Sequence, residues 1–122
     1  MITAVLNEIH FQEIIEKAAK DAGVDCLFAA EEETLLALFQ EGTPSVLLID
    51  LGNSNLDGAA LIQKLKQNPA TRSIPVVAFG NQIRADLMQD AKEMGADLVL
   101  PKSAFRGQLP ELIRHYDQCH DR

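Results

Sequence analysis

Apolar residues along the chain alternate between short continuous runs and segments in which they recur at helical spacing. The continuous runs predict five strands, at residues 2–6, 25–30, 45–51, 74–80 and 96–100. The remaining segments place apolar residues three or four positions apart, which predicts five helices within residues 11–22, 31–41, 57–68, 83–94 and 105–116. Strands and helices are therefore expected to alternate along the whole chain.

Strands that are apolar on both faces are typical of a parallel sheet covered by helices on both sides. Right-handed connections between successive strands then wind the sheet in two directions. The predicted fold class is α/β, with a (βα)5 doubly wound five-stranded parallel sheet in a three-layer sandwich. The 122 residues are expected to form one domain, with a polar tail at about 117–122.

Composition narrows the classes of function. The net charge of −7 opposes binding to nucleic acids and to anionic membrane surfaces, so neither partner is expected. Two cysteines, Cys26 and Cys119, fit neither a disulfide framework nor a zinc site, which favours a reducing, cytoplasmic location. The N-terminus does not resemble a signal peptide, and no apolar run is long enough to cross a bilayer.

The ends of four predicted strands carry the candidate chemistry. Asp50 ends the most apolar strand, Asn7 and Glu8 follow the first, Gly80 ends the fourth, and Lys102 follows the fifth. Because the carboxyl ends of parallel strands meet at one edge of a sheet, these residues are expected to lie close together. The alternative for Asp50 is a strand-end carboxylate satisfied by loop amides, and for Lys102 a salt bridge that only holds the edge together.

Three stretches make the chain resemble the receiver domains of bacterial response regulators, with their CheY-like, flavodoxin-like fold. The first is the apolar strand ending in Asp50 and followed by Asp57-Gly58, of which Asp57 is expected to cap a helix. The second is "IPVVAFG", a strand led by proline, and the third is "MGADLVLPK", which ends at Lys102. Together, and in this order, they predict an atypical receiver over nearly the whole chain.

The resemblance implies a role for each residue at the strand ends. Asp50 stands at the position that accepts a phosphoryl group, and Lys102 at that of the lysine that contacts the phosphoryl oxygens. Asn7 and Glu8 correspond, within one residue, to an acidic pair that holds Mg²⁺ with the acceptor aspartate. The backbone carbonyl of Gly52 is a further candidate ligand, and Mg²⁺ is expected to bind weakly because Asn7 lacks a charge.

Two departures from the family pattern affect signalling. The phosphate-contacting position that carries a hydroxyl in the family falls on Gly80, and the aromatic position of the fifth strand falls on Val99. The resemblance therefore implies that the usual hydroxyl-and-aromatic switch has neither of its parts. Phosphorylation of Asp50, if it occurs, is expected to be slow and to cause weak switching.

The resemblance also implies the partners. A histidine kinase or phosphotransfer protein is expected to supply the phosphoryl group, and a downstream protein to bind the fourth helix, fifth strand and fifth helix, at about residues 83–116. Homodimerisation through the same face is a further expectation. The chain is expected to be a signalling module and not an enzyme that turns over substrate.

Two other functions remain open at this stage. One is a constitutive scaffold that is never phosphorylated. The other is a small-ligand-binding protein of the flavodoxin type, although the segment "NEIHFQ" after the first strand lacks the Ser, Thr and Gly residues that would cradle a phosphate. The three histidines, His10, His115 and His120, lack metal-ligand spacing and are expected at the surface.

Overall fold

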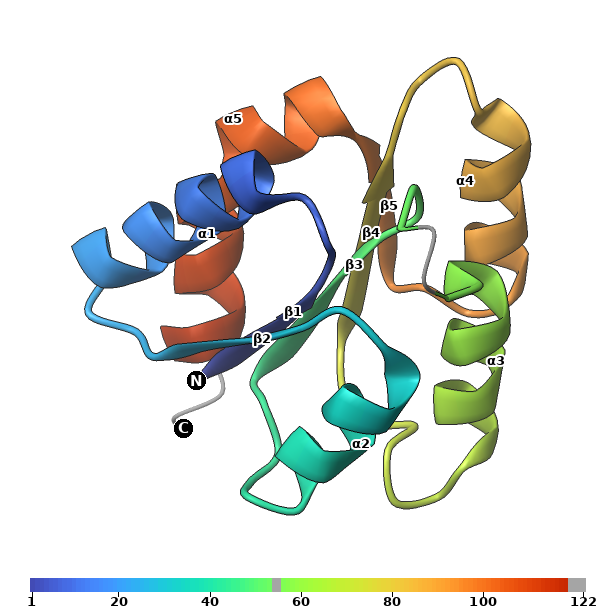
Figure 1. Ribbon diagram of the computed structural model, residues 1–122, viewed down its shortest axis with the longest axis horizontal. Helices are drawn as coiled ribbons and strands as arrows, with labels where there is room; N and C mark the ends of the chain where they lie inside the picture. The colour runs from blue at the N-terminus through green and yellow to red at the C-terminus, as the bar shows by residue number, and fades with distance from the viewer. Residues whose placement is uncertain (54–55, 119–122) are drawn as a thin grey trace.

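The computed structural model describes residues 1–53 and 56–118, and within them one parallel sheet forms the centre of the molecule (Figure 1). Its strand order is β2-β1-β3-β4-β5, and every neighbouring pair is parallel. The strands are β1 (Ile2–Val5), β2 (Cys26–Ala29), β3 (Val46–Asp50), β4 (Val76–Gly80) and β5 (Leu98–Pro101). The predicted five-stranded doubly wound sheet is confirmed.

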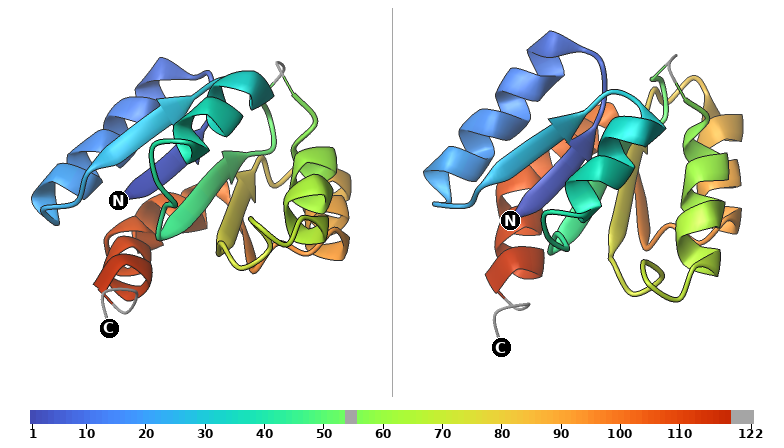
Figure 2. Two further views of the ribbon diagram at one scale, coloured as in Figure 1. Left: turned by 90° about the horizontal axis from the view of Figure 1, so that it is seen from below. Right: turned by 60° about the horizontal axis from the view of Figure 1, so that its bottom comes forward.

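Five helices cover the sheet on its two faces (Figures 1 and 2). Helices α1 and α5 lie on one face, and α2, α3 and α4 lie on the other. Their bounds are α1 (Ile9–Asp21), α2 (Glu32–Phe39), α3 (Gly58–Gln67), α4 (Ala85–Glu93) and α5 (Lys102–Ile113), and a π-helical turn over Arg114–Gln118 continues α5. In the described residues, no helix has the length and apolar character needed to cross a membrane.

Alternation along each strand produces two separate apolar cores. In β3, Leu48 faces the core under α1 and α5, whereas Leu47 and Ile49 face the core under α2, α3 and α4. All five residues of β3 and all five of β4 are buried, as expected for central strands covered on both sides. This packing fixes the positions of the strand ends that carry the candidate site.

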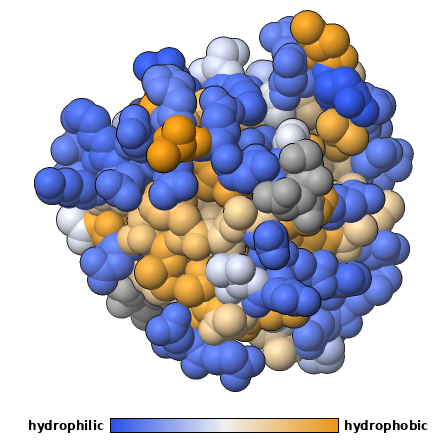
Figure 3. All heavy atoms as spheres, in the orientation of Figure 1, coloured by the Kyte–Doolittle hydropathy of each residue, from blue (hydrophilic) through white to orange (hydrophobic). Residues whose placement is uncertain are grey.

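Strand β2 forms one edge of the sheet and is only partly covered. Cys26, Leu27 and Phe28 are half-buried, and in Figure 3 apolar side chains gather where β2 runs between α1 and α2. Cys26 packs against the α1–α5 core from this edge. Burial raises the pKa of its thiol to about 12, so the thiol is protonated and unreactive at neutral pH.

The C-terminal part of the fold differs from the prediction. The last helix begins at Lys102, three residues earlier than its first apolar contact suggests, and it gives way to the π-helical turn before residue 116. Asp117, the first residue of the predicted polar tail, accepts hydrogen bonds through its carboxylate from the Ser45 hydroxyl at 2.8 Å and the Met1 amino group at 2.8 Å. Cys119, His120 and the rest of the tail lie outside the described residues.

Asp97 links the amino-terminal ends of β4 and β5, on the side of the sheet opposite to the candidate site. Its carboxylate accepts hydrogen bonds from the buried N–H of Val76 at 2.7 Å and from the Lys66 ammonium at 2.9 Å. Lys66 also donates to the carbonyl oxygen of Ile74 at 3.0 Å. These bonds join the end of α3 to the starts of β4 and β5 and satisfy a backbone donor that would be costly to leave unpaired.

Candidate functional site

The carboxyl ends of β1, β3, β4 and β5 meet at one edge of the sheet. The register pairs Val5 with Ile49, Asp50 with Phe79, and Gly80 with Pro101. Asn7 and Glu8 follow β1 after one intervening residue, Leu6, and Lys102 follows β5 as the first residue of α5. The predicted meeting of these strand ends is therefore confirmed.

Asp50 is deeply buried at this edge, with only 3% of its surface exposed. Its Oδ1 atom accepts a hydrogen bond from the backbone N–H of Gly52 at 2.8 Å. Its Oδ2 atom lies 4.0 Å from Nζ of Lys102, beyond hydrogen-bonding distance. One carboxylate oxygen is thus held by the loop, and the other faces the lysine.

Lys102 lies between two carboxylates from different strands. Its Nζ donates to Oε2 of Glu8 at 3.2 Å, a shorter contact than the 4.0 Å to Asp50. Two-thirds of the Lys102 side chain is buried, whereas Glu8 is about half exposed. The sequence analysis predicted that Lys102 lies near Asp50, but it did not predict the closer contact between Lys102 and Glu8. The ammonium group of Lys102 thus lies near both carboxylates.

Lys102 packs against a stack of aromatic rings in the core. The ammonium lies 5.5 Å from the ring centroid of Phe11, a cation–π geometry. The Phe11 ring stacks on Phe79 at 5.2 Å, and Phe79 stacks on Phe105 at 4.1 Å. The stack joins α1, β4 and α5 and connects the site to the core beneath it.

Leu51 fills the space that the two glycines of the site leave open. A Cβ atom at Gly58 would lie 2.9 Å from the end of the Leu51 side chain, so a larger residue there would force Leu51 to move. A Cβ atom at Gly80 would lie 3.4 Å from Leu51 and 3.8 Å from Met88. The position where the family pattern has a hydroxyl is therefore lined by aliphatic side chains, a feature that the sequence analysis missed.

The neighbouring Asp57 has a structural role. Its Oδ1 atom accepts a hydrogen bond from the N–H of Ala60 at 3.2 Å at the start of α3. This confirms the prediction that Asp57 caps the helix. The Asp57-Gly58 pair thus combines a cap with the close contact to Leu51.

The oxygen atoms at this edge suit a hard divalent cation, but they are few. The carboxylates of Asp50 and Glu8 are the charged candidates, with the Asn7 amide and the Gly52 carbonyl as neutral ones. In residues 1–53 and 56–118, no three His, Cys, Asp or Glu side chains gather closely enough to hold a metal ion. The Lys102 ammonium pairs with Glu8 at 3.2 Å and lies 4.0 Å from Asp50, so a cation would compete with it for both carboxylates. This donor set fits a weak Mg²⁺ site.

Burial dominates the protonation of Asp50. It raises the pKa of this carboxyl above its ordinary value, and the nearby charge of Glu8 adds to the rise. The Gly52 N–H and the Lys102 ammonium oppose the rise by stabilising the carboxylate. The ionised form of Asp50 therefore depends on these two partners.

This raised pKa predicts that Asp50→Asn stabilises the protein at neutral pH. The folded state binds protons more tightly than the unfolded chain at this site, so the free energy of unfolding falls as the pH rises from the ordinary to the raised pKa. Asparagine removes this cost and keeps an oxygen for the Gly52 N–H. We expect thermal unfolding at pH 7 to shift upward by several degrees, and the difference to shrink as the pH is lowered.

Asp90→Asn is the matched control, because Asp90 is exposed on α4 and its change should move the melting temperature little. A wild-type protein more stable than Asp50→Asn at pH 7 would contradict the prediction.

Comparison with known proteins agrees with this geometry. The family described as "Response regulator receiver domain" matches residues 2–114. The DNA-binding transcriptional regulator NtrC of Salmonella typhimurium is 32% identical over 89 residues, which are 73% of this chain and 19% of NtrC. The phosphate regulon regulator PhoB of Pseudomonas aeruginosa is 28% identical over 101 residues, 83% of this chain and 44% of PhoB. The chain thus spans less than half the length of these two relatives.

Among solved structures, a response regulator from Chloroflexus aurantiacus superposes with a TM-score of 0.83. The two share 23% sequence identity, and the alignment covers 94% of each chain. At this identity the likeness shows the fold alone, the CheY-like doubly wound arrangement that the sequence predicted.

Proposed function

The chain belongs to the family of response regulator receiver domains, and from this membership we propose that it is a phosphoryl-accepting signalling module whose acceptor is Asp50. The observation that carries the proposal is the strand-end geometry, with a buried carboxylate whose Oδ2 atom faces Lys102 at 4.0 Å. The chain is proposed to act as one receiver unit through protein contacts, and not as an enzyme with turnover.

The proposed chemistry is transfer from a phosphohistidine of a kinase or phosphotransfer protein. An oxygen of Asp50 attacks the phosphorus, the P–N bond breaks, and the imidazole leaves with a proton from solvent. Transfer of this kind depends mainly on positioning and charge neutralisation. The Gly52 N–H fixes one carboxylate oxygen at 2.8 Å, and the Lys102 ammonium is available to the phosphoryl oxygens.

Magnesium, if bound, would be held by Asp50 and Glu8, with the Asn7 amide and the Gly52 carbonyl as weaker donors. It would supply positive charge to the phosphoryl group. Glu8 must then exchange its 3.2 Å contact with Lys102 for the cation, which would free Lys102 for the phosphoryl oxygens. This exchange supports a weak site that strengthens when the phosphoryl group is present.

The absence of a hydroxyl at Gly80 argues for a muted response to phosphorylation. Leu51 and Met88 line the space beside Gly80, and Val99 offers no aromatic ring on β5. We propose that the downstream partner, or a second copy in a homodimer, binds the α4–β5–α5 face, residues 83–116, with little change in that face on phosphorylation. The exposed Ile83, with 86% of its surface accessible, lies within this segment.

A titration with beryllofluoride, which mimics a phosphoryl group on aspartate, tests this function. With Mg²⁺ present, we expect saturable changes in amide chemical shifts in the loops around Asp50 and Gly80, and small changes in α4 and β5. Mg²⁺ alone should bind more weakly than Mg²⁺ with beryllofluoride. The lack of any shift at the Asp50 loop would overturn the proposal, and large shifts through α4 and β5 would overturn the muted response.

A constitutive scaffold is the second candidate. The ion pair between Lys102 and Glu8 supports it, because it gives the lysine a partner without a phosphoryl group. In that case Asp50→Asn would leave partner binding unchanged. A flavodoxin-type ligand site has no comparable observation in its favour.

A further inference from the structure

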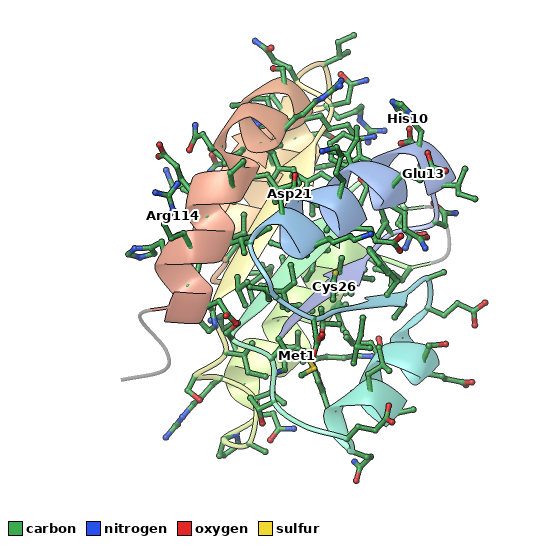
Figure 4. The ribbon with its side chains drawn as sticks, turned by 90° about the vertical axis from the view of Figure 1, so that its left-hand side faces the viewer. Met1, His10, Glu13, Asp21, Cys26 and Arg114 are labelled. Atoms are coloured by element: carbon green, nitrogen blue, oxygen red, sulfur yellow. The ribbon has the colours of Figure 1, made fainter. Side chains whose placement is uncertain are left out.

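A groove between α1 and α5 combines apolar and positively charged side chains, and none of them belongs to the candidate site around Asp50. Its volume is about 650 Å³, and its floor is apolar, formed by Ile14 and Ala18 of α1 and by Leu109 and Pro110 of α5. Three cations, Lys17, Arg106 and Arg114, stand around it together with one acid, Asp21. Figure 4 shows α1 and α5 side by side on this face, with Asp21 and Arg114 labelled.

Within residues 1–53 and 56–118, two of the three cations have no ion-pair partner. Lys17 pairs with Asp21 at 3.1 Å, within α1. Arg106 and Arg114 form no ion pair with any other residue of the described ranges. Two guanidinium groups without an ion pair in the described part of the chain therefore stand beside an apolar groove, although the net charge of the chain is −7. The groove is therefore a positive, partly apolar region on an otherwise acidic protein.

Pro110 interrupts the hydrogen bonding of α5 beside the groove. It lies inside the helix and has no N–H to donate to the carbonyl oxygen of Arg106, four residues earlier.

We propose that this groove binds an acidic amphipathic helix of another protein. A helix laid between two helices buries its apolar face and presents charges along its edges. Arg106 and Arg114 are eight residues apart, about 12 Å along a helix axis at the usual rise. A partner helix would match them with two acidic residues seven or eight positions apart, and with apolar residues three and four positions after the first acid.

The charges argue against other occupants. A two-fold homodimer through this groove would gather Lys17, Arg106 and Arg114 of both copies in one interface, which is repulsive. Nucleic acid and anionic membrane surfaces would be repelled by the net charge of −7. The acidic residues of a protein helix would be attracted by the cations of the groove. Because a single helix is narrow, it would contact little of the acidic surface elsewhere on the protein.

The test uses the full chain and a fluorescent helical peptide with two glutamates seven residues apart and leucines three and four positions after the first. Fluorescence anisotropy should show saturable binding that weakens at higher salt. The double variant Arg106→Glu/Arg114→Glu should bind at least about tenfold more weakly. The control Lys20→Glu/Lys92→Glu, with the same change in net charge outside the groove, should bind within about twofold of the wild type.

Further controls separate this inference from the proposed function. A peptide with glutamine in place of both glutamates should bind much more weakly, and Asp50→Asn should bind as the wild type does. Amide shifts on peptide addition should concentrate in α1 and α5. No saturable binding, equal binding of the glutamine peptide, equal binding by the Arg106→Glu/Arg114→Glu variant, or preferred binding to anionic vesicles or duplex DNA would overturn the inference.

Discussion

Replacing Asp50 with asparagine is expected to abolish phosphoryl loading by acetyl phosphate and Mg²⁺. The amide lacks the negative oxygen that attacks phosphorus, while its size and its contact with the Gly52 N–H are retained. Intact-mass analysis should show one added phosphoryl group on the wild type and none on the variant. The fold should survive, because asparagine removes a buried charge and no packing atom.

The matched controls for this experiment are the other two carboxylates of the region. Asp57→Asn should leave loading on Asp50 intact, because Asp57 caps α3 and does not face Lys102. Glu8→Gln should slow loading without abolishing it, because Glu8 is a proposed ligand and not the acceptor. A phosphoryl group on Asp50→Asn, or no loading of the wild type at any donor concentration, would contradict the assignment of Asp50.

The sequence contained enough information to predict the sheet and the meeting of the strand ends. Strand runs that are apolar on both faces specify a parallel sheet, and in such a sheet the ends at Asp50 and Lys102 must share an edge. This inference needs only the order of the strands and the family pattern. It does not need any side-chain contact, which is why it could be made from residues alone.

Contacts between side chains could not be predicted in the same way. Lys102 has a flexible side chain that can reach either Asp50 or Glu8, and its choice of Glu8 at 3.2 Å depends on the depth of Asp50 below the surface. The packing of Leu51 between Gly58 and Gly80 likewise depends on the distance between two loops. In the sequence, the only indication of this packing was that Gly58 and Gly80 both lie near the predicted strand ends.

The bonds made by the end of the last helix could not be predicted for a related reason. Asp117 is held by Ser45 and Met1, which are distant in sequence. Periodicity reports only the face that a helix buries, and it carries no information about polar bonds made across the molecule. The groove at α1 and α5 was also not apparent from the sequence, because Arg106 and Arg114 approach α1 only in the folded chain.

Removing the central ring of the aromatic stack is expected to cause the largest loss of stability. Phe79 is fully buried and stacks on Phe105 at 4.1 Å and on Phe11 at 5.2 Å. Phe79→Ala should lower the free energy of unfolding by about 3–5 kcal/mol, through lost apolar burial and the cavity that remains. Urea unfolding followed by circular dichroism measures this loss.

Phe39→Ala is the control, because Phe39 is only half-buried on α2 and its loss should be smaller. Phe79→Leu covers the case in which the alanine variant does not fold, and it should lie between wild type and alanine. Equal losses for Phe39→Ala and Phe79→Ala would contradict the role of the stack. Because Phe11 carries Lys102 above it, a collapse of the stack in Phe79→Leu should also displace the ammonium and slow the loading of Asp50, whereas Phe39→Ala should not.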